Sequence, residues 1–99
     1  AGEVMAVGAG VTAFRPGDRV AYGTELGGYA QERNIRADRI VELPSAISFE
    51  TAAAMMLQGM TVRYLFRETF LVRPGTVMLF HAAAGGVGLI ASQWAWAQP

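Results

Sequence analysis

The chain has 99 residues, of which 53% are hydrophobic and 16% charged, a composition that fits one globular domain and excludes a disordered chain. Its formal net charge is zero, and its eight basic residues, all arginines, are spread from Arg15 to Arg73, so no basic patch indicates nucleic acid or an anionic membrane as a partner. The absence of cysteine excludes disulfides and thiolate zinc sites.

No apolar run reaches the roughly 20 residues of a membrane span, and the N-terminus lacks the basic and apolar regions of a signal peptide. We therefore expect no membrane association and a cytoplasmic protein. Because the chain begins with Ala1 rather than methionine, we also expect it to be an internal piece of a longer protein.

The first 44 residues alternate short apolar stretches with turn residues such as Pro16 and Gly17. This pattern predicts a short strand at 3–7 and a turn leading into a strand at 15–20. It also predicts an exposed strand within 25–35 and a last strand at 39–44. Several short strands joined by turns indicate a small β-barrel or sandwich, or part of one.

Helical composition begins after residue 45. Ser48 is a suitable N-cap, and Glu50 would lie in the first turn, where the helix dipole favours an acid. We expect Gly59 to interrupt this helix and a second helix to follow at about 60–68.

The last quarter of the chain predicts a strand, a glycine-rich loop and a helix. The nearly continuous apolar run at 76–82 is typical of a strand buried on both faces of a parallel sheet. After the loop, the helix would place Val87, Ile90, Ala91 and Trp94 on one face.

The glycine pattern of nucleotide-binding loops occurs once in full, from Gly8 to Ala13. A phosphate-binding loop must open a helix, because the helix N-terminus supplies the N–H donors and the positive end of the dipole. Here Pro16 and Gly17 follow before a helix could form, so we interpret the full match as a β-turn.

A partial match runs from Ala83 to Gly88 and has the required context between a strand and a helix. Gly85 would let the backbone approach a pyrophosphate, and Gly88 would let the helix pack closely on the strand. A tight strand-to-helix turn without a ligand remains the alternative on this motif alone.

Three stretches carry a family resemblance: "AGEVMAVGAGVTAFRPGDRV", "LPSAISFETAAAMMLQGMTVRYLF" and "VRPGTVMLFHAAAGGVGLIASQWA". In this order and spacing they resemble the zinc-independent, zeta-crystallin-like quinone oxidoreductases of the medium-chain dehydrogenase/reductase superfamily. The resemblance covers essentially the whole chain, and the run from His81 to Ala91 is similar to the quinone reductase branch in particular.

The resemblance implies an α/β chain: a partial GroES-like β-barrel followed by the first β-α unit of a Rossmann fold. Residues 1–58 would be the C-terminal part of the GroES-like domain, and residues 59–99 the start of the NAD(P)-binding domain. It also implies a set of cofactor-binding residues: Thr61 beside the nicotinamide, and Gly85, Gly86, Val87 and Gly88 at the pyrophosphate.

The implied function is hydride transfer from a nicotinamide cofactor to a quinone or activated alkene. The resemblance implies NADPH, with NADH left open because the selecting residue would lie beyond the chain, and it implies a homodimer. We expect no metal site and no zinc, since the chain has no cysteine and His81 is its only histidine. We assign no catalytic residue.

Two alternatives to an enzyme segment remain open at this point: a truncated paralogue that acts as a non-catalytic interaction module, and a purely structural fragment. In either case the strand at 76–82 lacks neighbours within the chain. We therefore expect the isolated chain to be inactive and to be poorly folded or to self-associate through apolar surface.

Overall fold

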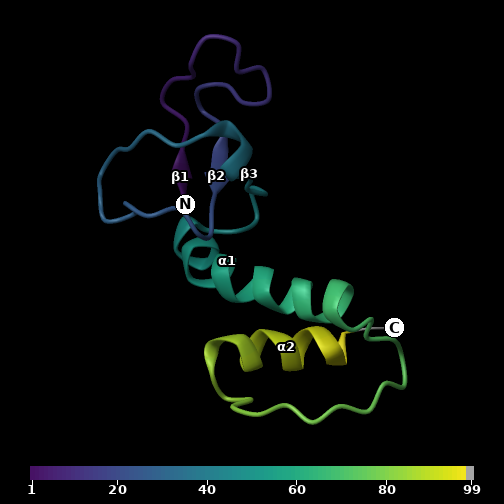
Figure 1. Cartoon of the computed structure of the whole chain (residues 1–99). Helices are drawn as coiled ribbons and strands as arrows, with labels where there is room; N and C mark the ends of the chain where they lie inside the picture. The colour runs from purple at the N-terminus through teal and green to yellow at the C-terminus, as the bar shows by residue number, and fades with distance from the viewer. Residues whose placement is uncertain (98–99) are drawn as a thin grey trace. The chain divides into compact units, whose positions relative to one another are not determined.

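The computed structural model describes residues 1–97 (Figure 1). It divides into two compact units, Ala1–Met56 and Leu57–Pro99. The described residues form a small α/β structure with a three-stranded sheet and two α-helices. Within this described part, no helix is both long and apolar enough to cross a membrane.

The sheet of the first unit is antiparallel and very short. Its strands are β1 (Gly2–Glu3), β2 (Arg19–Ala21) and β3 (Val41–Glu42), in the order β1-β2-β3. The predicted turn before β2 is confirmed: Asp18 Oδ2 accepts a hydrogen bond of 2.9 Å from the Arg15 N–H, and Gly17 has φ +94°.

Two of the predicted strands are much shorter than expected, and one is absent. The stretch 3–7 contributes only its first residue to β1, and 39–44 contributes only β3, which the 3₁₀-helix Ala37–Arg39 precedes. The predicted strand within 25–35 is wrong, because this loop pairs with no described strand. Instead, Arg33 Nη1 donates to the Glu25 carbonyl at 3.3 Å and to the Tyr22 hydroxyl at 3.4 Å.

The core of the first unit gathers three buried residues, Ala21, Leu43 and Ala52, with Ile47, Phe49 and Met56 packed against them. Arg19 connects β2 to the segment before the first α-helix. Its guanidinium donates to the carbonyls of Pro44 and Ile47 at 3.0 and 2.7 Å, and it lies 4.4 Å from the centre of the Phe49 ring.

Helix α1 (Phe49–Tyr64) begins as the sequence predicts. The Ser48 hydroxyl accepts a hydrogen bond of 3.1 Å from the Thr51 N–H, which satisfies one of the donors at the helix start. The predicted break at Gly59 is wrong, because one glycine costs a helix only about 1 kcal/mol and packing outweighs that amount. The predicted second helix is the end of α1 followed by the π-helix η2 (Leu65–Thr69).

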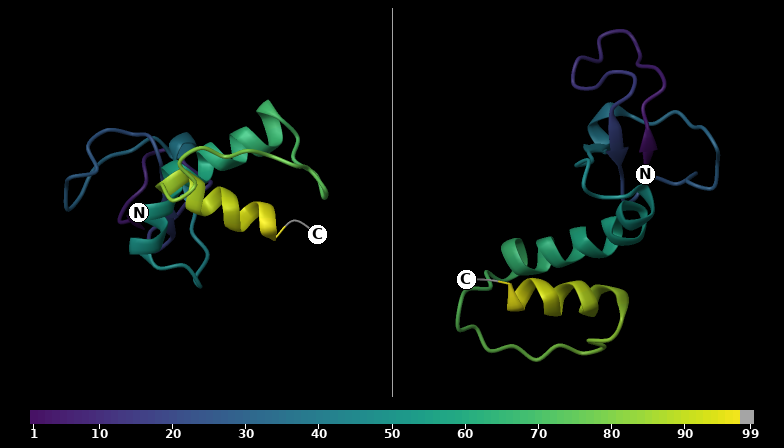
Figure 2. Two further views of the ribbon diagram at one scale, coloured as in Figure 1. Left: turned by 90° about the horizontal axis from the view of Figure 1, so that it is seen from below. Right: turned by 180° about the vertical axis from the view of Figure 1, so that it is seen from behind.

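The core of the second unit joins the later part of α1, η2 and helix α2 (Gly86–Trp96), and Figures 1 and 2 show α2 next to this later part of α1. Its buried residues are Val62, Phe66, Val72 and Ala91. The predicted inner face of α2 is confirmed, since Val87, Ile90 and Trp94 pack against this cluster. The Trp94 ring meets Phe66 edge to face at 6.3 Å.

The predicted buried strand at 76–82 is wrong in this structure. Residues 76–80 form no strand, and residues 81–84 form a turn. Val77 and Leu79 are 97% and 85% exposed, although their apolar side chains are typical of a parallel-sheet interior. A parallel strand needs neighbours to bond its backbone, and the described residues supply none.

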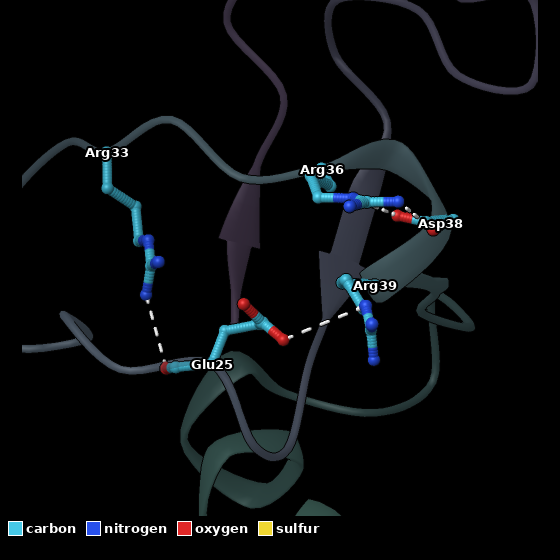
Figure 3. Close-up of polar contacts among 5 residues, drawn as sticks. All are labelled: Glu25, Arg33, Arg36, Asp38 and Arg39. Carbon is cyan, nitrogen blue, oxygen red and sulfur yellow. Dashed lines mark hydrogen bonds and ion pairs between the residues drawn. The ribbon is translucent and has the colours of Figure 1, made fainter.

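An arginine–carboxylate group lies beside the sheet of the first unit (Figure 3). Arg36 donates from Nε and Nη2 to the two carboxylate oxygens of Asp38, at 2.9 and 2.7 Å. Arg39 lies 3.9 Å from the Glu25 carboxylate. The hydrogen bonds from Arg36, assisted by its charge and that of Arg39, hold the pKa of Asp38 below its ordinary value of 3.8.

We expect the substitution Arg36→Gln to raise the pKa of Asp38 toward this ordinary value, because it removes the principal cause of the depression. A carboxyl with a depressed pKa stabilises the fold above its unfolded pKa and loses this effect as the pH falls through the folded pKa. The pair is exposed, so the change in stability is expected to be small. Titration of the Asp38 side chain by carbon-13 NMR measures the shift, with Arg15→Gln as control; an unchanged Asp38 pKa would contradict the assignment.

Candidate glycine-loop site

The loop before α2 has a specific backbone geometry. Ala82 has φ +56°, in the left-handed region that residues with a Cβ rarely adopt. Its carbonyl accepts a hydrogen bond of 2.9 Å from the Gly85 N–H, which closes the turn. Gly85 is then extended, with φ −78° and ψ 171°, and α2 starts at Gly86.

Gly88 is required by its surroundings rather than by its own φ. A Cβ at this position would lie 2.5 Å from the Ala83 carbonyl oxygen and 2.6 Å from that of Ala82. A Cβ at Gly85 would lie 3.2 Å from the Ala82 oxygen. The first turn of α2 therefore packs directly on the backbone of the preceding turn, and only glycine allows this approach at residue 88.

The same geometry leaves backbone donors at the start of α2. Within residues 1–97, the N–H groups of Gly86, Val87 and Gly88 have no protein acceptor, and no side chain caps the helix. The first turn carries no acidic residue, and Gly85 and Gly86 are exposed. Three donors at the positive end of a helix dipole can bind an anionic group such as a phosphate.

Sequence reasoning missed Gln58, which the structure brings to this loop. A Cβ on Gly86 would lie 3.2 Å from both Cγ and Nε2 of Gln58, so the amide side chain lies against the start of α2. The available signal was the spacing of Gln58 and Thr61, because residues three apart share a helix face. Thr61 is half-buried, and its hydroxyl donates to the Leu57 carbonyl at 2.9 Å.

The full glycine pattern at Gly8–Ala13 opens no helix. A turn at residues 9 and 10, with Gly10 at φ +82°, follows β1, and the Val11 N–H donates across it to the Gly8 carbonyl at 3.2 Å. The interpretation of this match as a turn is confirmed by the coil that continues to residue 15.

In the described part of the chain, the histidine and the two tyrosines considered next do not come together to form a site. His81 is exposed in the turn before α2, and within residues 1–97 no three histidine, aspartate or glutamate side chains lie close enough together to hold a metal ion. Tyr22 is half-buried, with the Arg33 guanidinium 5.1 Å from its ring. The Tyr29 side chain is fully exposed.

Comparison with known proteins finds long matches to oxidoreductases, while no family model matches the chain. The chain is 56% identical over 96 residues to a quinone oxidoreductase of Pseudomonas aeruginosa, covering 96% of this chain and 30% of that protein. It is 43% identical over 98 residues to a 2-haloacrylate reductase of a Burkholderia species, covering 29% of that protein.

A solved structure agrees with these matches. The structure of Escherichia coli quinone oxidoreductase complexed with NADPH superposes with a TM-score of 0.90 at 56% identity, over 97% of this chain and 30% of that one. The chain thus spans about 30% of the length of the relatives it matches. With this identity over nearly all its residues and this agreement in structure, the chain is similar throughout its length to one segment of the quinone oxidoreductases.

Proposed function

We propose that the chain is a segment of an NADPH-dependent quinone oxidoreductase, a cytoplasmic enzyme that transfers hydride to a quinone or an activated alkene. The observation that carries this proposal is the 56% identity to quinone oxidoreductases over 96 residues, which include the whole glycine loop. The relatives support both substrate classes, since one is a quinone oxidoreductase and another a 2-haloacrylate reductase. The homodimer that the resemblance implies belongs to this proposal.

The two units fit the two domains that the family resemblance implies. We assign residues 1–58 to the C-terminal part of a GroES-like domain and residues 59–99 to the start of a Rossmann domain. The division between Met56 and Leu57 supports this boundary to within two residues. The extended segment at 76–80, the turn and α2 follow one another in the order of a first β-α unit.

The glycine loop fits a dinucleotide cofactor on geometric grounds. The unpaired N–H groups of Gly86, Val87 and Gly88 would donate to the pyrophosphate, and exposed Gly85 would let it approach the backbone. Gln58 beside Gly86 would contribute a further amide. Thr61, three residues after Gln58, is assigned to the nicotinamide side of the cofactor.

When bound, the nicotinamide supplies the hydride, and the protein orients the ring and stabilises the charge that develops on the substrate oxygen. The chain has no cysteine, so a thiolate-bound zinc cannot polarise that oxygen through this segment. We propose that the polarisation comes from hydrogen-bond donors, and that the enzyme works without zinc.

A chimeric enzyme tests the proposal. The 96 matched residues replace their counterparts in the Pseudomonas aeruginosa relative, whose other 70% supplies the missing structure. We expect the chimera to bind NADPH and to reduce 1,4-benzoquinone with kcat/KM within about tenfold of the parent, because the loop donors are backbone groups. Cofactor binding is measured by NADPH fluorescence and turnover by loss of NADPH absorbance.

The parent enzyme is the positive control, and circular dichroism establishes that the chimera is folded. A folded chimera that binds no NADPH would overturn the assignment of the glycine loop. A chimera that binds NADPH without reducing any quinone or enone would favour the non-catalytic interaction module, which no observation on the described residues supports at present.

A further inference from the structure

Gly86 is a glycine at a position that the nucleotide-binding pattern leaves open. The pattern, matched from Ala83 to Gly88, requires small residues at 83, 85 and 88 and accepts any residue at 86. The φ of Gly86 is not positive, so its backbone conformation does not require glycine either. What a Cβ at this position would meet is the side chain of Gln58, whose Cγ and Nε2 would both lie 3.2 Å away.

The Gln58 amide has no hydrogen-bond partner among residues 1–97, although the residue is half-buried. In the described part of the chain no buried side-chain nitrogen or oxygen lacks a partner, so the Gln58 amide must reach solvent. Its polar neighbour on α1, Thr61, already donates its hydroxyl proton to the Leu57 carbonyl. A ligand at the start of α2 can therefore reach the Gln58 amide.

The Gln58 amide lies close to the backbone donors of α2. A Cβ lies about 2.5 Å from the nitrogen of its own residue, so Nε2 of Gln58 is within about 6 Å of the Gly86 nitrogen. A hydrogen bond joins donor and acceptor over about 2.9 Å, so two donors at this separation can bind oxygens of one phosphate group. The side chain thus adds a donor from α1 to those of the glycine loop.

No charged side chain comes from the sequence around this position. Residues 51–62 and 74–97 contain no lysine, arginine, aspartate or glutamate. A phosphate group here would be bound by neutral donors of these segments, and hydrogen bonds to a charged acceptor are stronger than those between neutral groups. The loss of one amide donor should therefore produce a measurable loss of affinity.

We propose that the Gln58 amide donates through Nε2 to the pyrophosphate of the cofactor, and that residue 86 is glycine because this side chain needs the space. The inference rests on the proposed function and assigns different roles to two adjacent glycines. Gly85 lets the pyrophosphate approach the backbone, whereas Gly86 lets Gln58 approach the pyrophosphate. Gln58 is thereby a cofactor-binding residue.

Binding of NADPH to the chimeric enzyme, measured by NADPH fluorescence, tests the role of Gln58. Gln58→Met keeps the length and apolar stem of the side chain and removes the donor. We expect the dissociation constant to rise about tenfold, because a hydrogen bond to a charged group is lost. Gln58→Glu, which has the same shape and a negative charge, is expected to raise it further.

The control is Gln93→Met, the same substitution on α2. The Gln93 side chain is exposed, and its amide donates to the Leu89 carbonyl at 3.1 Å. We expect this variant to change the dissociation constant by less than about twofold. Circular dichroism establishes that each variant is folded.

A truncated ligand locates the contact. 2′-Phospho-ADP-ribose keeps the phosphates of NADPH and lacks the nicotinamide ring, and its affinity is measured by competition with NADPH. We expect Gln58→Met to weaken both ligands by the same factor. A loss for NADPH alone would place Gln58 at the nicotinamide and overturn the proposed contact.

A double-mutant cycle tests the role of Gly86. Gly86→Ala moves the Gln58 amide, so we expect it to weaken NADPH binding about three- to tenfold when Gln58 is present. With Gln58→Met already made, the same change should alter binding by less than about twofold, because no donor is left to move. Equal effects in the two backgrounds would show that the new Cβ acts on the cofactor directly, and would disprove this role of Gly86.

The inference and the proposed function can fail separately. If a folded Gln58→Met chimera binds NADPH as tightly as the unchanged chimera, the role of Gln58 is disproved while the loop donors keep theirs. If the unchanged chimera binds no NADPH, the assignment of the glycine loop fails, and the role of Gln58 fails with it.

Discussion

Replacing Gly88 with alanine is expected to destabilise the second unit by about 2–3 kcal/mol, the upper part of the range for overpacking. The added Cβ would lie 2.5 and 2.6 Å from the carbonyl oxygens of Ala83 and Ala82. These are backbone atoms, so no side-chain rotation relieves the contact. Alanine has a better helix propensity than glycine, but this stabilises the helix by only about 1 kcal/mol. The steric contact is larger, so the net change in the free energy of unfolding is destabilising.

Urea unfolding followed by far-ultraviolet circular dichroism measures this change at one fixed chain concentration. Gly86→Ala is a matched control in the same loop, because its Cβ would meet only the flexible side chain of Gln58. Gly8→Ala is a second control, in the glycine pattern that opens no helix, because a Cβ there would have no atom within 4 Å. If Gly88→Ala were as stable as these controls, the close packing of α2 on the turn would be disproved.

In the chimeric reductase, the same Gly88→Ala change is expected to weaken NADPH binding. The carbonyls of Ala82 and Ala83 can escape the new Cβ only if the turn moves away from α2. Such a movement turns the N–H groups of Gly86 and Val87 away from the position in which both would donate to the pyrophosphate. We expect the affinity for NADPH to fall by about tenfold or more, and each tenfold loss corresponds to about 1.4 kcal/mol of binding free energy. Unchanged binding would show that these donors do not hold the cofactor.

Replacing Phe66 with alanine is expected to cost about 3–5 kcal/mol, the usual loss for a buried phenylalanine. Phe66 is 4% exposed, lies in the core of the second unit and contacts the Trp94 ring edge to face. The edge-to-face contact contributes about 0.5–1.5 kcal/mol of this amount. A loss of this size is comparable to the whole stability of a small unit, so its helices are expected to unfold.

Phe70→Ala is the matched control, since the same residue type four positions later is 64% exposed and its loss should cost less than about 1 kcal/mol. Trp94 fluorescence reports on the core, and the exposed Trp96 is first replaced by phenylalanine to remove its signal. We expect a red shift for Phe66→Ala alone. Equal effects of the two substitutions would contradict the assignment of the core.

Much of the local structure follows from short patterns along the chain. Ser48 predicts the start of α1 because its hydroxyl reaches an N–H three residues on, whatever the rest of the fold does. The inner face of α2 follows from apolar residues at helical spacing. The glycine loop is recognisable because a tight turn into a helix needs glycine at fixed positions.

The sequence by itself determined the helix start, the α2 face and the loop, since each depends on residues within a few positions of one another. Only the tertiary structure decided three other features: the passage of α1 through Gly59, the position of Gln58 against Gly86, and the unpaired state of 76–80. Each of these depends on which distant backbone or side chain lies alongside. An apolar run predicts burial, but burial also requires a neighbour, and no local pattern specifies one.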